Sequence, residues 1–128
     1  MSIGGSIGTA GTQAGSQIDK MFRALADRTR LRIMHLLQDE ELCVTDILGI
    51  LDVPQAKASH HLTYLRRAGL VEMRKQGLWC FYRLRPAQSV LHEKLLDCLE
   101  HCFTCAPDLI ADRERAAEVK ASGGCCPK

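Results

Sequence analysis

Apolar residues recur at intervals of three or four along most of the chain, and this spacing predicts amphipathic helices. The first predicted helix covers about residues 18–26, where four apolar residues follow that interval. The second begins after Asp27 or Thr29, because either side chain can cap a helix. Proline is favoured in the first turn of a helix, so Pro54 and Pro86 each mark a predicted start. The remaining predicted helices cover about residues 44–51, 54–68, 86–105 and 108–120.

After Gly69 the helical interval gives way to alternation between apolar and polar residues. Val71 and Met73 precede a turn predicted at residues 75–77, and alternation resumes over residues 78–84, which predicts a β-hairpin with a basic tip. Two helices joined by a short turn and followed by such a hairpin are typical of a winged helix-turn-helix. The predicted fold is therefore mainly α with a small β-hairpin, a winged helix-turn-helix that dimerises through its terminal helices.

Composition divides the chain into three segments. Residues 1–17 hold five glycines among Ser, Thr and Ala, and are expected to form a disordered tail. Residues 18–105 are expected to form the winged-helix DNA-binding and dimerisation domain, and residues 106–128 a C-terminal helix with a cysteine-containing tail. No apolar run is long enough to span a bilayer and no secretory signal is recognisable, so we expect a cytoplasmic protein without a membrane partner.

Charge is unevenly distributed. The net charge is only +2, yet residues 54–85 hold seven Lys and Arg residues and one acidic residue. A basic face on a mildly acidic body is what contact with nucleic acid requires, although a solvated surface would have the same composition.

Several motifs together resemble the ArsR/SmtB family of dimeric repressors, which metals or metalloids release from DNA. They are residues 41–48 (ELCVTDIL), 59–62 (SHHL), 69–71 (GLV), 74–77 (RKQG) and 82–84 (YRL). The resemblance covers about residues 18–102. It implies a homodimer on double-stranded operator DNA, not an enzyme, with bases read by Gln55, Ala56, Ser59 and His60. It also implies contacts of Arg74, Lys75 and Gln76 with phosphates or the minor groove, whereas His61 is expected to serve packing.

Dimerisation is also expected from the helix after residue 86. Leu91, Leu95 and Leu99 give it an apolar surface that a chain of 128 residues cannot easily cover alone. Its predicted inward stripe continues into cysteines 98, 102 and 105, spaced as in a coiled-coil seam.

The metal sites that the resemblance implies are missing. The arsenite-sensing branch gathers three thiols in the third helix, but here only Cys43 is present, with Thr45 and Leu48 at the other two positions. The family's zinc site on the last helix maps onto residues 86, 88, 99 and 102, which supply no matching set of ligands.

Sulfur is instead concentrated near the carboxyl end. Seven cysteines in a reducing compartment favour thiol chemistry over disulfides, and soft thiolates favour soft ions. We therefore predict no tightly bound cofactor, As(III) or Sb(III) as the effector, and Cd(II) or Zn(II) as alternatives. The predicted ligands are Cys98, Cys102 and Cys105, with Cys43, Cys125 and Cys126 as secondary candidates.

Other interpretations of the cysteines remain open. Cysteine packs as a small apolar residue, and Cys80, beside the anchoring Trp79, is expected to do so. The chain could also be a dithiol redox or persulfide sensor on the same frame, since some relatives pair cysteines near positions 43 and 102. A thiol enzyme or a metal-buffering protein without DNA binding is a further alternative.

Overall fold

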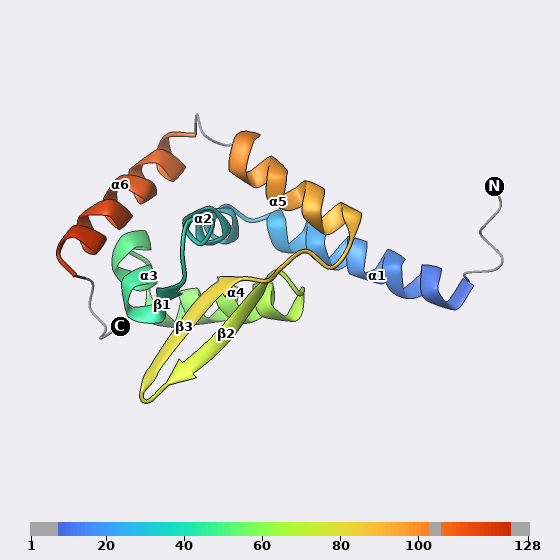
Figure 1. Cartoon of the computed structure of the whole chain (residues 1–128), viewed down its shortest axis with the longest axis horizontal. Coiled ribbons are helices and arrows are strands. Elements are labelled where there is room, and N and C mark those ends of the chain that lie inside the picture. Colours follow the sequence, from blue (N-terminus) through green and yellow to red (C-terminus); the bar gives the residue numbers. More distant parts are fainter. Residues whose placement is uncertain (1–7, 103–105, 124–128) are drawn as a thin grey trace.

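The described part of the chain is a winged helix-turn-helix, as predicted, with six helices and a small antiparallel sheet at one side of them (Figure 1). The computed structural model describes the backbone of residues 8–102 and 106–123, and the side chains of residues 17–101 and 106–123. None of the helices in these ranges is both long enough and apolar enough to cross a membrane. The elements are α1 (Gly8–Leu25), α2 (Arg28–Leu36), β1 (Leu42–Cys43), α3 (Val44–Leu51), α4 (Gln55–Arg67), β2 (Val71–Gln76), β3 (Trp79–Leu84), α5 (Val90–Cys102) and α6 (Pro107–Ala121).

Local sequence signals set the limits of the central helices. Asp27 caps α2 by accepting a hydrogen bond from the Arg30 amide, as one of the two predicted caps. The bounds of α3 are those predicted, and α4 begins directly after Pro54. Gly69 follows α4 with a φ of 80°, a left-handed conformation that favours glycine and ends the helix.

The hairpin formed by β2 and β3 extends beyond the helices (Figure 1). Its turn consists of Gly77 and Leu78, so Lys75 and Gln76 belong to β2 and not to the predicted turn. The strand β1 was not predicted. It is two residues long and pairs with β3, which places β3 in the centre of the sheet.

Two predicted helix starts are wrong. The helix α1 begins at Gly8, ten residues before the predicted start and within the segment expected to be disordered. Ala10, Gln13 and Ala14 are good helix formers, and the prediction weighed only the glycines around them. The helix α5 begins at Val90, not at Pro86, because Ser89 caps it by accepting a hydrogen bond from the His92 amide at 3.1 Å.

The core fills the space between α2, α3, α4 and the base of the sheet. Its fully buried side chains include Ile33, Met34, Ile47, Ile50, Leu62, Leu65 and Leu70. The inward side of α5 differs from the predicted stripe: His92 and Leu99 are buried, Leu91 and Leu95 are half-buried, and Cys98 is exposed. The coiled-coil interval therefore placed Cys98 on the wrong side of α5, and Leu99 belongs to the core instead of a dimerisation surface.

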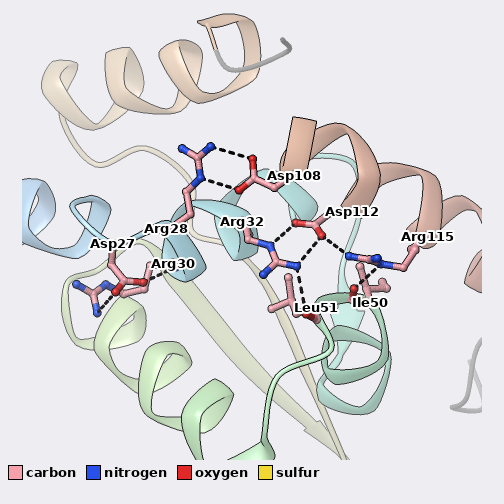
Figure 2. A network of polar contacts seen from close by, with 9 residues as sticks. All are labelled: Asp27, Arg28, Arg30, Arg32, Ile50, Leu51, Asp108, Asp112 and Arg115. Atoms are coloured by element: carbon pink, nitrogen blue, oxygen red, sulfur yellow. Dashed lines mark hydrogen bonds and ion pairs between the residues drawn. The ribbon is translucent and has the colours of Figure 1, made fainter. Parts of the chain in front are cut away.

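Ion pairs hold α6 against α2 and α3. Asp112 is fully buried, and its carboxylate accepts two hydrogen bonds of 2.8 Å from the guanidinium of Arg32 (Figure 2). Arg32 also donates to the Leu51 carbonyl, and Arg115 donates to Asp112 and to the Ile50 carbonyl. The C-terminal helix is thereby fixed to the helix that precedes the helix-turn-helix turn.

Candidate nucleic-acid interface and cysteine sites

The first two turns of α4 expose the four residues expected to read bases. Gln55, Ala56, Ser59 and His60 are all exposed. The opposite side of the helix is buried through Ala58, His61, Leu62 and Leu65. Burial of that side fixes the rotation of α4 and gathers the four predicted residues on its solvent side.

His61 has a structural role, as its sequence context predicted. It is buried, and its Nδ1 lies 3.1 Å from Nη1 of Arg30. Since a guanidinium can only donate, the imidazole nitrogen must accept. Burial lowers the pKa of His61, the carboxylate of Asp27 opposes this shift, and the charge of Arg30 adds to it. His61 is thus a neutral acceptor in the interior, which leaves its neighbour His60 as the histidine available to a ligand.

Arg30 organises this region and was not singled out by the sequence analysis. It is buried, donates to the Ala24 carbonyl at 2.6 Å and to the Arg23 carbonyl at 3.1 Å, and lies 4.1 Å above the ring of Tyr64. It therefore joins the end of α1 to the middle of α4. The sequence places Arg30 between two other arginines, and no local pattern distinguishes the buried one.

The hairpin exposes Arg74, Lys75 and Gln76, as expected for residues that meet a DNA backbone. Arg74 already has partners: it pairs with Glu41 at 2.6 Å, donates to Gln76 at 2.8 Å and lies 4.5 Å above the Phe81 ring. The bond to Glu41 raises the pKa of the guanidinium. A phosphate would have to replace Glu41 at Arg74, whereas no ion pair of Lys75 is found within the described part of the chain.

The tip of the hairpin is built by one glycine. Gly77 has a φ of 63°, a left-handed conformation that favours glycine, and a Cβ there would meet no heavy atom within 4 Å apart from its chain neighbours. The neighbouring Leu78, predicted to belong to a strand, is 99% exposed in the turn. The hairpin therefore ends in an apolar side chain that follows Lys75, Gln76 and Gly77 in the sequence.

The described cysteine side chains differ in bonding and in burial. Cys43 is disulfide-bonded, which corrects the expectation that the cysteines are thiols and that Cys43 is available as a thiolate ligand. It is buried, and its sulfur also accepts a hydrogen bond from the Asp46 amide at 3.4 Å, which caps α3. Cys80 is a free thiol that packs against the core, as predicted, and Cys98 is exposed. Cys102 ends α5, but its side chain lies outside the described residues, as do Cys105, Cys125 and Cys126. The predicted thiolate site thus stays a prediction.

Among the described side chains, one group of three could hold a metal ion. Asp97, Glu100 and His101 lie together on α5, all exposed. His101 already pairs with Asp97 at 3.3 Å, as exposed helical neighbours commonly do. This group contains no sulfur and is unrelated to the predicted ligands.

Comparison with known proteins gives matches centred on the helix-turn-helix. A family model described as "Bacterial regulatory protein, arsR family" matches residues 27–73. The "Arsenical resistance operon repressor" of Escherichia coli (strain K12) is 47% identical over 79 residues, which cover 61% of this chain and 68% of that repressor. The "Cadmium resistance transcriptional regulatory protein CadC homolog" of Staphylococcus aureus is 43% identical over 68 residues, covering 52% of this chain and 56% of the homologue.

Comparison with solved structures also identifies a regulator with a similar fold. HlyU from Vibrio cholerae N16961 superimposes with a TM-score of 0.62 at 33% identity. The match covers 72% of this chain and 96% of that one.

Proposed function

This chain belongs to the arsR family of bacterial regulatory proteins, and we propose that it is a homodimeric repressor that leaves its operator when cysteine thiolates bind As(III) or Sb(III). Members of the family are DNA-binding transcriptional regulators and not enzymes. A regulator of this kind acts where its DNA is, in the cytoplasm. The observation that carries the proposal is the exposed side of α4, held outward by the buried residues behind it.

In this proposal α4 enters a major groove and the hairpin lies against the backbone. Gln55 has the amide that suits adenine, and His60 can donate to or accept from a base edge. Lys75 and Gln76 position the protein by contacting phosphates or the minor groove, and Arg74 joins them when it leaves Glu41.

The proposed dimer uses the apolar residues left exposed on α1 and α5. Phe22 is 52% exposed, Ile18 40% and Val90 72%, and Leu91 and Leu95 of α5 are half-buried. Large apolar side chains gathered on one surface commonly mark an interface. A homodimer would place two copies of α4 about 34 Å apart, one turn of DNA. Sedimentation as a monomer at micromolar concentration would contradict this part of the proposal.

The effector assignment rests on the number and type of cysteines. Positions 98 and 102 are four apart in α5, an interval that puts residues on the same side of a helix, and Cys98 is exposed. Thiolates prefer soft ions such as As(III), Sb(III) and Cd(II). Two similar bacterial proteins, an arsenical resistance operon repressor and a cadmium resistance regulator homologue, support the same class of ion.

Release of DNA by ions tests the proposal directly. The reduced protein is bound to a duplex that it has selected from a random pool, and arsenite, antimonite, Cd(II) or Zn(II) is then titrated. For a coupling of about 2 to 3 kcal/mol, arsenite should lower DNA affinity roughly 30- to 150-fold. Cys102→Ser should keep DNA binding and lose this response, Cys98→Ser should weaken the response or lose it, and Cys80→Ser should respond normally. Normal release of Cys102→Ser by arsenite would remove the site from α5.

A thiol redox or persulfide sensor is the second candidate, and the disulfide at Cys43 favours it. Two thiols would lose two electrons and two protons to a peroxide, which is reduced to water or alcohol. Oxidation should then change DNA affinity in the wild type and leave Cys43→Ser unaffected. Loss of DNA binding with peroxide, together with no response to arsenite, would select this function over the first.

A further inference from the structure

A pocket of about 360 Å³ lies between α1 and α4, beside the proposed reading surface. Five of its lining residues carry polar side chains that suit an anion or its oxygens, and Tyr64 adds an aromatic wall. Lys20 and Arg23 come from α1, and His60, Thr63 and Arg67 come from α4. No carboxylate lines the pocket among the described residues.

The pocket is held in shape by links between α1 and α4 at both of its ends. At one end Gln17 Nε2 donates to the Ala68 carbonyl at 2.6 Å. At the other end Arg30 donates to the carbonyls of Ala24 and Arg23 and stacks on Tyr64. The walls are therefore formed before any ligand arrives, which lowers the entropic cost of binding.

The three cations of this pocket have no ion-pair partner among the residues that the structure describes. No ion pair with a described side chain is made by Lys20, Arg23 or Arg67. Six other arginines do make such pairs, namely Arg28, Arg32, Arg74, Arg83, Arg113 and Arg115. Three unpaired cations around one hollow repel one another, and an anion would remove that repulsion. The pocket is thus electrostatically suited to a phosphate.

The pocket is continuous with the proposed base-reading side of α4. His60, Thr63 and Arg67 are spaced by three and four, so they lie on one side of the helix, and Ala56 lies one turn before His60. His60 belongs both to the predicted base-reading set and to the lining of the pocket. A duplex that touches Ala56 and His60 therefore continues toward Arg67 and α1.

We propose that the pocket between α1 and α4 receives a backbone phosphate of the operator, outside the base pairs that the first turns of α4 read. The guanidinium groups of Arg23 and Arg67 and the ammonium of Lys20 would neutralise it, and the Thr63 hydroxyl can donate to one of its oxygens. The inference rests on the proposed function, because it assigns α1 to the DNA-contacting surface of the same regulator. Such a contact fixes the orientation of the protein and reads no sequence.

The first experiment measures affinity and its salt dependence on a duplex selected by the wild-type protein and on a random duplex. Arg23→Gln and Arg67→Gln should each weaken both duplexes by a similar factor, on the order of 3- to 10-fold, and reduce the salt slope by about 0.9. The matched control is Lys94→Gln, which removes one exposed charge from α5 and should change affinity less than about twofold. Losses in Arg67→Gln no larger than those in Lys94→Gln would overturn the proposal.

The second experiment locates the phosphate. Single phosphates of the selected duplex are replaced in turn by uncharged methylphosphonates. At one position in each half-site the replacement should weaken the wild type but leave Arg67→Gln unchanged, since the contact is already lost. If the two losses add at every position, the pocket does not hold a backbone phosphate.

Two further outcomes separate this inference from the proposed function. If the protein selects no duplex at all, DNA binding itself has failed, and with it both proposals. If inorganic phosphate perturbs the NMR signals of Thr63 and Tyr64 while no methylphosphonate position couples to Arg67, the pocket holds a free anion and the inference alone is overturned.

Discussion

Arginines serve opposite purposes in two regions of this molecule. Where α6 meets α2, Arg32 and Arg115 are satisfied by the buried carboxylate of Asp112 and by main-chain carbonyls (Figure 2). Where α1 meets α4, Arg23 and Arg67 have no carboxylate partner among the described residues. The arginines at α6 join that helix to the rest of the fold, and those between α1 and α4 leave positive charge for a ligand. Residue type alone does not separate the two roles; the partner does.

The short helix α2 shows the same contrast within five residues. Arg28 pairs with Asp108 near solvent, Arg30 is buried and lies over the Tyr64 ring, and Arg32 binds Asp112 in the interior. Arg28 and Arg32 are four residues apart, so they lie on one side of α2 and both face α6, whereas Arg30 lies on another side. That other side meets the end of α1 and Tyr64 of α4.

The largest effect is expected at the buried carboxylate. Asp112→Ala leaves the guanidinium of Arg32 without its charge partner in a mostly buried setting, and should lower the free energy of unfolding by about 3 to 5 kcal/mol. Urea unfolding followed by circular dichroism measures it. Glu114→Ala, an exposed change on the same helix, should cost little. Equal stability of the two variants would mean that the Asp112 pair does not hold α6.

The base-reading and backbone-contacting residues should separate in a binding assay. His60→Ala should cost about 1 to 3 kcal/mol on the selected duplex and little on random DNA. Lys75→Ala should weaken both duplexes alike and reduce the salt slope by about 0.9. Equal losses of His60→Ala on the two duplexes would show that His60 does not read bases.

Acid should destabilise the fold through its buried histidines. Burial is the main cause that lowers the pKa of His35, His61 and His92 below the ordinary value of 6.5. Below about pH 6.5 these histidines therefore bind protons in the unfolded chain but not in the folded chain. The free energy of unfolding should fall from pH 7 to pH 5 by about 1.4 kcal/mol per pH unit for each such proton. Unfolding at both pH values measures the slope.

A matched pair of variants assigns that slope. His35→Gln should reduce the pH dependence, because it removes one buried group that titrates on unfolding. His101→Gln changes an exposed histidine and should leave the dependence as it is. A stability that stays flat between pH 7 and pH 5 in the wild type would contradict the prediction.

The smallest effect is expected at the exposed ion pair. Arg28 and Asp108 share two short hydrogen bonds, as Arg32 and Asp112 do, but near solvent. Arg28→Ala should therefore cost less than about 1 kcal/mol, and added salt should reduce the difference further. A loss as large as that of Asp112→Ala would show that burial does not decide the strength of these pairs.

The sequence predicted what local signals control. The bounds of α3, the cap of α2 at Asp27, the end of α4 at Gly69 and the hairpin all follow from residues close in sequence. The exposed set from Gln55 to His60 followed from the motif resemblance and from the buried positions between its members.

What the sequence did not predict depends on distant partners. The strand β1 exists only because Leu42 and Cys43 pair with β3 forty residues later in the chain, and two residues carry no alternation. Asp112 lies in a charged helix whose pattern gives no sign that this carboxylate is buried. The start of α5 could be predicted from the sequence, since Ser89 is a recognisable cap, but Pro86 indicated an earlier start.

Cys43 has a mechanical consequence for both parts of the proposed DNA-contacting surface. Its main chain pairs with Phe81 in β3, and its sulfur closes the first turn of α3, with no residue in between to absorb a movement. The hairpin and the helix-turn-helix therefore share one rigid joint. A displacement of this residue by a fraction of an ångström would be magnified along the length of the hairpin, so its tip would move farthest.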